Sequence, residues 1–110
     1  MIERQLAQAR ENGTSAVSVL ANGTDEVLAV ATVILCNQTG SNVTYRLFHD
    51  DDGTTYDETT ALAWDVQLGP YQTDILCLKA VLGGNQAVGN FAYRTSTGDA
   101  ITITLYGFTV

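Results

Sequence analysis

One histidine, His49, stands directly before Asp50, and this pair has the residue types used in general acid–base catalysis. A histidine titrates near neutral pH, and a neighbouring carboxylate can orient its ring. A hydrolytic site also needs a nucleophile, and the chain has no Ser in a Gly-x-Ser-x-Gly context. We therefore predict that the protein is not an enzyme and has no catalytic residues. His49 is expected to be a solvated histidine at a strand end.

Residues 50–58 form an acidic segment with five carboxylates in nine positions. Asp50, Asp52 and Asp57 would offer oxygen ligands of the kind that Ca²⁺ prefers. The segment lacks the alternating Asp or Asn residues of an EF-hand loop, its closing Glu and its flanking helices. An ordinary turn is the favoured alternative, with Asp side chains accepting hydrogen bonds from backbone amides and Gly53 in the left-handed region. No metal site and no cofactor is predicted.

Cys36 and Cys77 each follow an Ile-Leu pair inside an apolar run. A bridge between them would close a loop of about forty residues and stabilise the fold by about 4 kcal/mol. The first residues show no apolar stretch of a signal peptide, which argues against an oxidising compartment. We expect two buried thiols, with a disulfide as the alternative. Zinc would need four ligands, and only His49 is present to help.

Two further features have a plain structural interpretation. Trp64 is expected in the core, on one apolar face with Leu62 and Val66, and not on an exposed platform for sugar stacking. Four Asn residues stand in Asn-x-Thr sequons, which carry no information without a secretory signal and are interpreted as turn and strand residues: Asn12, Asn22, Asn37 and Asn42.

The composition fits one soluble domain. The chain has 110 residues, 45% of them hydrophobic, which is enough to bury a single core. A net charge of -7 has the wrong sign for nonspecific attraction to nucleic acid or to an anionic membrane. No apolar run approaches the ~20 residues of a membrane helix. We predict no nucleic-acid partner and no membrane partner.

Turn residues divide the chain into short runs of the kind found in all-β domains. The runs are apolar or alternating and rich in Val, Ile and Thr, and Gly, Asn, Asp and Thr clusters separate them. Seven strands are predicted from this pattern: 15–20, 26–37, 42–49, 61–68, 73–82, 90–95 and 101–106. With no room for crossover helices, the strands must pair antiparallel.

The predicted fold is a single antiparallel β-sandwich, jelly-roll or Ig-like, with a small barrel as the alternative. Residues 15–110 would form the sandwich and residues 1–14 an arm. Residues 1–11 have helix-forming composition but are too few to hold a helix alone, so the arm is a short helix, an extended segment that orders on a neighbouring subunit, or a loose end. The runs 26–37 and 73–82 are apolar on both faces, so their outer faces are expected to be covered by another copy. Ala-rich outer faces and bulges would produce the same pattern.

Several stretches of the chain resemble small virion proteins of tailed bacteriophages: residues 6–10, 33–40, 45–48, 50–62 and 101–107. These stretches are strands and turns and hold no catalytic signature. The resemblance implies a non-enzymatic β-sandwich that coats or joins particle components, foremost a capsid decoration or cement protein. Such proteins often sit as homotrimers at symmetry axes and clamp neighbouring major capsid subunits, many of them with a terminal arm.

The resemblance also implies that the protein is a virion component assembled in the host cytoplasm, with self-association and the major capsid protein or other virion proteins as partners. Two alternatives stay open. One is a tail or neck adaptor or fibre-associated protein of the same particle. The other is a carbohydrate- or Ca²⁺-binding β-sandwich that recognises a host surface.

Overall fold

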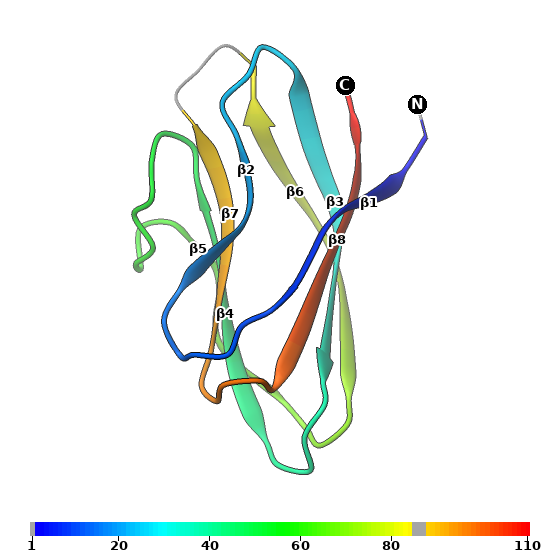
Figure 1. Ribbon diagram of the computed structural model, residues 1–110, viewed down its shortest axis with the longest axis vertical. Coiled ribbons are helices and arrows are strands. Elements are labelled where there is room, and N and C mark those ends of the chain that lie inside the picture. Colours follow the sequence, from blue (N-terminus) through cyan, green and yellow to red (C-terminus); the bar gives the residue numbers. More distant parts are fainter. Residues whose placement is uncertain (1, 85–87) are drawn as a thin grey trace.

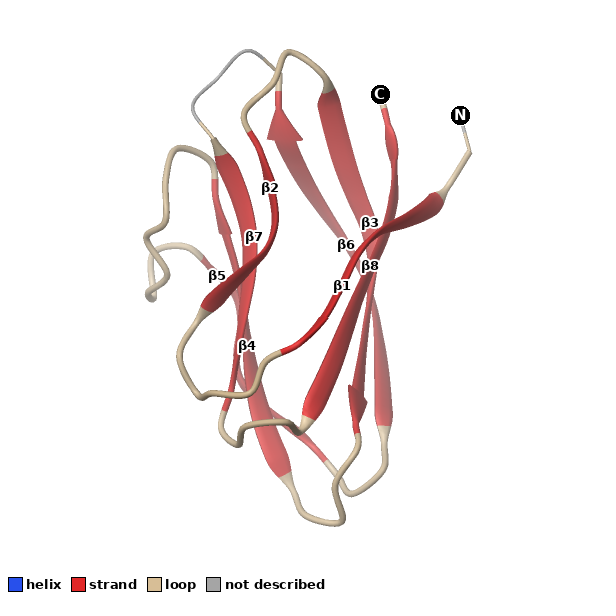
Figure 2. Ribbon diagram, in the orientation of Figure 1, coloured by secondary structure: helices blue, strands red, loops and turns tan. Residues whose placement is uncertain are grey.

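The computed structural model describes residues 2–84 and 88–110, and these contain β-strands and loops but no helix (Figures 1 and 2). No helix able to cross a membrane is therefore found among the described residues. The eight strands are β1 (Arg4–Arg10), β2 (Val17–Asn22), β3 (Val27–Asn37), β4 (Val43–Asp50), β5 (Ala61–Leu68), β6 (Thr73–Gly83), β7 (Gly89–Thr95) and β8 (Ile101–Thr109).

The strands form two four-stranded sheets that face each other (Figure 1). Sheet A has the order β1-β8-β3-β6, and sheet B has the order β2-β7-β4-β5, with antiparallel pairing throughout. The first strand thus pairs with the last, the second with the seventh, the third with the sixth and the fourth with the fifth. This is a long hairpin rolled into two sheets, the jelly roll. The predicted all-β sandwich is confirmed.

Each of the seven predicted runs corresponds to a strand, and the eighth strand, β1, lies in the segment expected to be an arm. β1 is extended, and it pairs with β8 from Arg4 opposite Gly107 to Arg10 opposite Thr102. The short-helix alternative is wrong, because the edge of β8 offers the backbone partners that a lone helix of this length would lack. Three of its side chains, Leu6, Ala7 and Ala9, pack against the core.

The core fills the space between the sheets. Alternate side chains of the central strands point inward and are almost completely buried, and the aromatic rings among them come from sheet B: Tyr45, Phe91 and Tyr93. Sheet A contributes aliphatic residues, chiefly Val33, Leu35, Ile101, Ile103 and Leu105. Burial of this apolar surface is the main force that holds the two sheets together.

A β-bulge in β5 overturns the prediction for Trp64. The pairing of β4 with β5 shifts register around Leu47, and Asp65 has a φ of 48°. A one-residue bulge sends later side chains to the opposite face. Val66 therefore packs against the core, whereas Leu62 and Trp64 lie outside, 45% and 39% exposed. The expected single apolar face of this strand was wrong because the bulge divides it.

Candidate functional site

The acidic segment is the loop between β4 and β5, and it lies against the outer face of sheet B (Figure 1). The amide of Asn90 donates a 2.6 Å hydrogen bond to the Gly53 carbonyl, and Ser18 donates one of 2.7 Å to Asn90. The ring of Tyr56 stands 5.9 Å from that of Phe48. Although Phe48 points away from the sandwich interior, these loop contacts leave it only 1% exposed.

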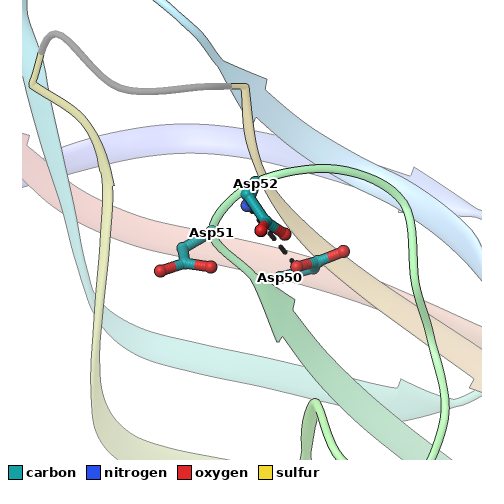
Figure 3. Close-up of side chains that lie close together, drawn as sticks. All are labelled: Asp50, Asp51 and Asp52. Atoms are coloured by element: carbon teal, nitrogen blue, oxygen red, sulfur yellow. Dashed lines mark hydrogen bonds between the residues drawn. The ribbon is translucent and has the colours of Figure 1, made fainter.

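Asp50 organises the start of this loop. Asp50 is 5% exposed, and its carboxylate accepts a hydrogen bond of 2.7 Å from the backbone N–H of Thr55. It accepts a second, of 3.4 Å, from the backbone N–H of Asp52 (Figure 3). The Thr55 bond is the main reason that the pKa of Asp50 lies below its ordinary value. The pKa of Asp52 is raised, first by its hydrogen bond with Asp50 and then by the negative charge of Asp50. Backbone donors compensate the buried carboxylate, as in an ordinary turn.

The carboxylates nearest one another are not the set expected from the sequence. Oxygen atoms of Asp50, Asp51 and Asp52 lie within 4.8 Å of one another, whereas Asp57 accepts hydrogen bonds from the backbone and hydroxyl of Thr59. Gly53 does not have a positive φ, since among the described glycines only Gly83 and Gly84 do. The expected left-handed role of Gly53 is therefore wrong. Its carbonyl instead anchors the loop to Asn90.

His49 does not form a dyad with Asp50. Neighbouring residues in a strand point to opposite faces, and the Asp50 carboxylate is engaged by its own loop. The expectation of a solvated ring is also wrong, because His49 is half-buried and its Nε2 atom is enclosed without a hydrogen-bond partner among the described residues. The backbone N–H of His49 donates to Thr60, which closes the loop.

Beside the loop lies a cluster of ion pairs that the sequence patterns did not predict. Arg46 contacts Asp65 through two hydrogen bonds of 2.6 and 3.0 Å, and Arg94 approaches the same carboxylate at 3.8 Å. The Arg46 bonds hold the pKa of Asp65 below its ordinary value. The Arg46 guanidinium also lies 3.7 Å from the centre of the Trp64 ring. One face of this ring is thus occupied by the protein itself and is not open to a sugar.

The two cysteines are free, and their geometry excludes a bridge. In the pairing of β3 with β6, Cys36 lies opposite Thr73 and Cys77 opposite Thr32. The thiols are thus four residues apart along neighbouring strands, roughly 13 Å at ~3.3 Å per residue, against a Cα separation of at most ~7 Å in disulfides. Cys36 is half-buried and Cys77 exposed, so the expectation of two buried thiols was wrong. Both lie on the outer face of sheet A.

Two of the four sequons hold the connections between the sheets. Asn37 is completely buried, and its amide donates to the carbonyls of Ser41, Leu68 and Gly69. Its Oδ1 accepts hydrogen bonds from the backbone and hydroxyl of Thr39. Asn22 makes the corresponding contacts where β2 turns into β3: it donates to Glu26 and Leu82 and accepts from Thr24. These two side chains have structural roles, whereas Asn12 and Asn42 are exposed.

The sandwich is open where β5 and β6 form neighbouring edges of the two sheets. A cleft of about 410 Å³ lies there and is lined mainly by apolar side chains. At its wall the hydroxyl of Tyr45 donates a 2.8 Å hydrogen bond to Asp74. Burial and then the Asp74 bond raise the pKa of Tyr45. The cleft has a single carboxylate and offers no pair of groups for acid–base chemistry among its lining residues.

No loop covers the outer face of sheet A in the way that the acidic loop covers the outer face of sheet B (Figure 1). Its outward residues form four rows across the strands: Phe108, Ala29 and Val81; Tyr106, Thr32 and Cys77; Thr104, Ile34 and Ile75; and Thr102, Cys36 and Thr73. None of these is a carboxylate, in a chain with twelve. Lys79 on β6 and Arg10 on β1 lie at its margins, and the Arg10 guanidinium is 4.0 Å from the exposed Asp99 carboxylate.

This face has both a hollow and a projection. Ala29 and Ala31 are small and lie between Phe108 and Val81, which leaves a depression of about 350 Å³ that Lys79 also lines. Two rows away, Ile75 is 65% exposed. The expected apolar outer faces of the long strands are therefore present. The pairing of β3 shifts register between Val30 and Thr32, so Ala-rich positions and a bulge contribute to the pattern as well.

The topology defines the architecture, a jelly roll of eight strands, which is found among other places in viral capsid and lectin domains. A solved chain of infectious bursal disease virus, Gx strain, has a similar fold over 99% of this chain, with a TM-score of 0.53 and 10% sequence identity. A chain of the Gt strain of the same virus covers 97% of this chain at a TM-score of 0.45 and 12% identity. This chain spans 38% and 30% of those two chains. No protein-family model and no curated protein sequence matches it.

Proposed function

We propose that this chain is a non-enzymatic structural protein of a virus particle, foremost a decoration or cement protein of a bacteriophage capsid. The observation that carries the proposal is the likeness in fold, over 99% of this chain, to a chain of infectious bursal disease virus. The resemblance of its strands and turns to small virion proteins supports the same role. It would be assembled in the host cytoplasm and function in the virion.

The surfaces suit a protein that binds other proteins. Contacts between proteins gain stability from apolar area removed from water, at about 25 cal/mol per Å². The apolar, bare outer face of sheet A would supply such area for contact between copies of this chain. Symmetric repetition makes a modest contact strong over a whole shell. The remaining surface is acidic, with a net charge of -7, and would repel packaged nucleic acid. On the particle, copies would group as trimers at symmetry axes and contact neighbouring major capsid subunits.

Counting the copies in purified particles tests this role. Quantitative mass spectrometry against labelled peptides of this chain and of the major shell protein should give hundreds of copies per particle. A few to a few tens of copies would place the protein in the tail or neck instead. Its absence from the particle would overturn the proposal.

The effects of added ligands distinguish the proposed structural role from that of a module that binds a host surface. If the chain were a Ca²⁺- or carbohydrate-binding module, Ca²⁺ would raise the melting temperature or a glycan would shift the Trp64 fluorescence. The proposed structural role predicts neither effect. The matched control for the second assay is Trp64→Phe, which removes the signal and keeps an aromatic ring.

A further inference from the structure

We infer that two copies of this chain pack face to face through the outer surface of sheet A, with Ile75 of each copy packed against the wall of the other's hollow. The hollow is the depression of about 350 Å³ between Phe108 and Val81, floored by Ala29 and Ala31. This self-association does not depend on where the protein works. It concerns an interface that exists in the isolated chain.

Charge selects this face for contact between identical copies. Two molecules with a net charge of -7 repel each other wherever their carboxylates meet. The outward positions of sheet A hold no carboxylate, whereas the acidic loop and Asp65 lie over sheet B and Asp74 points into the cleft. Lys79 and Arg10 stand on the two edge strands of sheet A, β6 and β1, where their charged ends reach water at the rim of a pair.

The positions of hollow and projection fit a two-fold axis. Consider a two-fold axis that lies between the facing A sheets of the two copies and runs perpendicular to the strands. Such an axis reverses the order of the four rows in the partner. It places the row of Ile75 opposite the partner's row of Val81, and the row of Cys77 lies near the axis. Such an axis keeps each strand opposite the same strand of the partner, so each Ile75 on β6 lies over the partner's Val81, at the wall of the hollow. Both contacts form at once, as an isologous interface requires.

The area is sufficient for a stable pair. Four strands at ~4.8 Å spacing and about ten residues at ~3.3 Å each give a face of about 600 Å² per copy. Two such faces bury about 1,200 Å² in total, the lower end of the range for specific interfaces. Its centre is apolar and its margin holds Thr, Gln, Arg and Lys side chains, the arrangement usual in protein interfaces. We therefore expect a dimer that dissociates on dilution.

Sedimentation equilibrium of the full chain under reducing conditions, over a wide range of concentration, tests the inference. The mass should rise from 11.8 kDa to twice that value as the concentration increases. Ile75→Arg should weaken the dimer at least tenfold, because it replaces the projection with a charge. Val88→Arg is the matched control: Val88 is 49% exposed and lies outside sheet A, so its dimer should be unchanged.

A complementation experiment tests the geometry. Ala31→Phe fills the hollow and should also weaken the dimer. When Ile75→Arg is mixed with Ala31→Phe, one intact Ile75 meets one intact hollow, so the mixture should associate more tightly than either variant alone. Circular dichroism and thermal melting establish that each variant folds. If Ala31→Phe does not fold, Val81→Phe fills the same hollow and replaces it in the experiment.

Three results would overturn the inference: a wild-type monomer at all concentrations, a trimer without a dimer, or a mixture no tighter than its components. The copy number in particles is measured separately. If the protein is monomeric but abundant in virions, the inferred interface is wrong and the proposed function is supported. If it is a dimer but absent from virions, the interface is supported and the proposed function is wrong.

Discussion

The hydroxyl of Tyr45 donates a hydrogen bond of 2.8 Å to the carboxylate of Asp74 and thereby joins the two sheets across the open side of the sandwich. Tyr45 is on a central strand of sheet B, and Asp74 is on the edge strand of sheet A. The remaining lining of this side is mostly apolar. The bond therefore holds β6, and with it the outer face that carries Ile75, in register with the core.

Loss of this bond should destabilise the protein most clearly at neutral pH. Tyr45→Phe removes the hydroxyl and should lower the free energy of unfolding by about 1.5–3 kcal/mol, the usual contribution of a hydrogen bond to a charged group. Because the pKa of Tyr45 is raised in the folded state, its contribution is present below the ordinary tyrosine pKa of about 10 and is lost as the pH rises further. Urea unfolding between pH 7 and 11 measures both effects. An equal alkaline loss in wild type and Tyr45→Phe would contradict this account.

The buried side chain of Asn37 should contribute more to the free energy of unfolding than the side chain of an exposed sequon residue. Asn37→Ala leaves three carbonyls without their donor and should destabilise by about 2–4 kcal/mol. Asn42→Ala is the matched control, because Asn42 is exposed, and it should change stability by less than about 0.5 kcal/mol. Denaturant unfolding of the two variants gives the comparison, and similar losses would show that the Asn37 contacts do not hold the turn.

Acid should weaken the fold through its hydrogen-bonded carboxylates. The pKa values of Asp50, Asp57 and Asp65 are lowered by the Thr55 amide, by Thr59 and by Arg46 respectively. Lowered values stabilise the folded state above the ordinary pKa near 3.8, and this stability is lost as the pH falls through the lowered values. We expect a flat stability curve from pH 7 to 5 and a fall below about 4. Asp50→Asn should be less stable at pH 7 and fall less steeply, and an unchanged slope would count against the role of Asp50.

Chelation should leave the acidic loop intact. The Asp50 carboxylate is compensated by backbone donors, and Asp57 by Thr59, so the loop does not require a cation for its conformation. The melting temperature should therefore be the same with a chelator and with millimolar Ca²⁺. A rise of several degrees with Ca²⁺ that Asp52→Asn abolishes would show that the loop is a cation site after all.

Much of the fold follows from local sequence patterns. The alternation of β8 and the turn clusters between runs predict the strands because the period of side chains is a property of the backbone. β1 was not predicted as a strand, because its partner, β8, lies at the other end of the chain. Its Leu, Ala, Gln and Arg residues favour a helix locally, and a tertiary contact overrides this preference.

The faces of the strands are harder to predict than the strands themselves. A single bulge at Asp65 places Trp64 outside and Val66 inside, although the alternation suggests one face. The cluster of Arg46 with Asp65 and Trp64 depends on that bulge and was missed for the same reason. The exposure of Cys77 follows from the edge position of β6, which is a property of the sheet order and has no local signal.

The rate of alkylation of Cys77 tests most directly whether the outer face of sheet A is an interface. This thiol is exposed in the single chain and lies on edge strand β6, in the row next to the two-fold axis of the inferred contact. Mass spectrometry should show rapid modification in dilute solution and a severalfold slowing as the concentration rises, and Ile75→Arg should abolish the slowing. A rate constant that does not change with concentration would contradict the account.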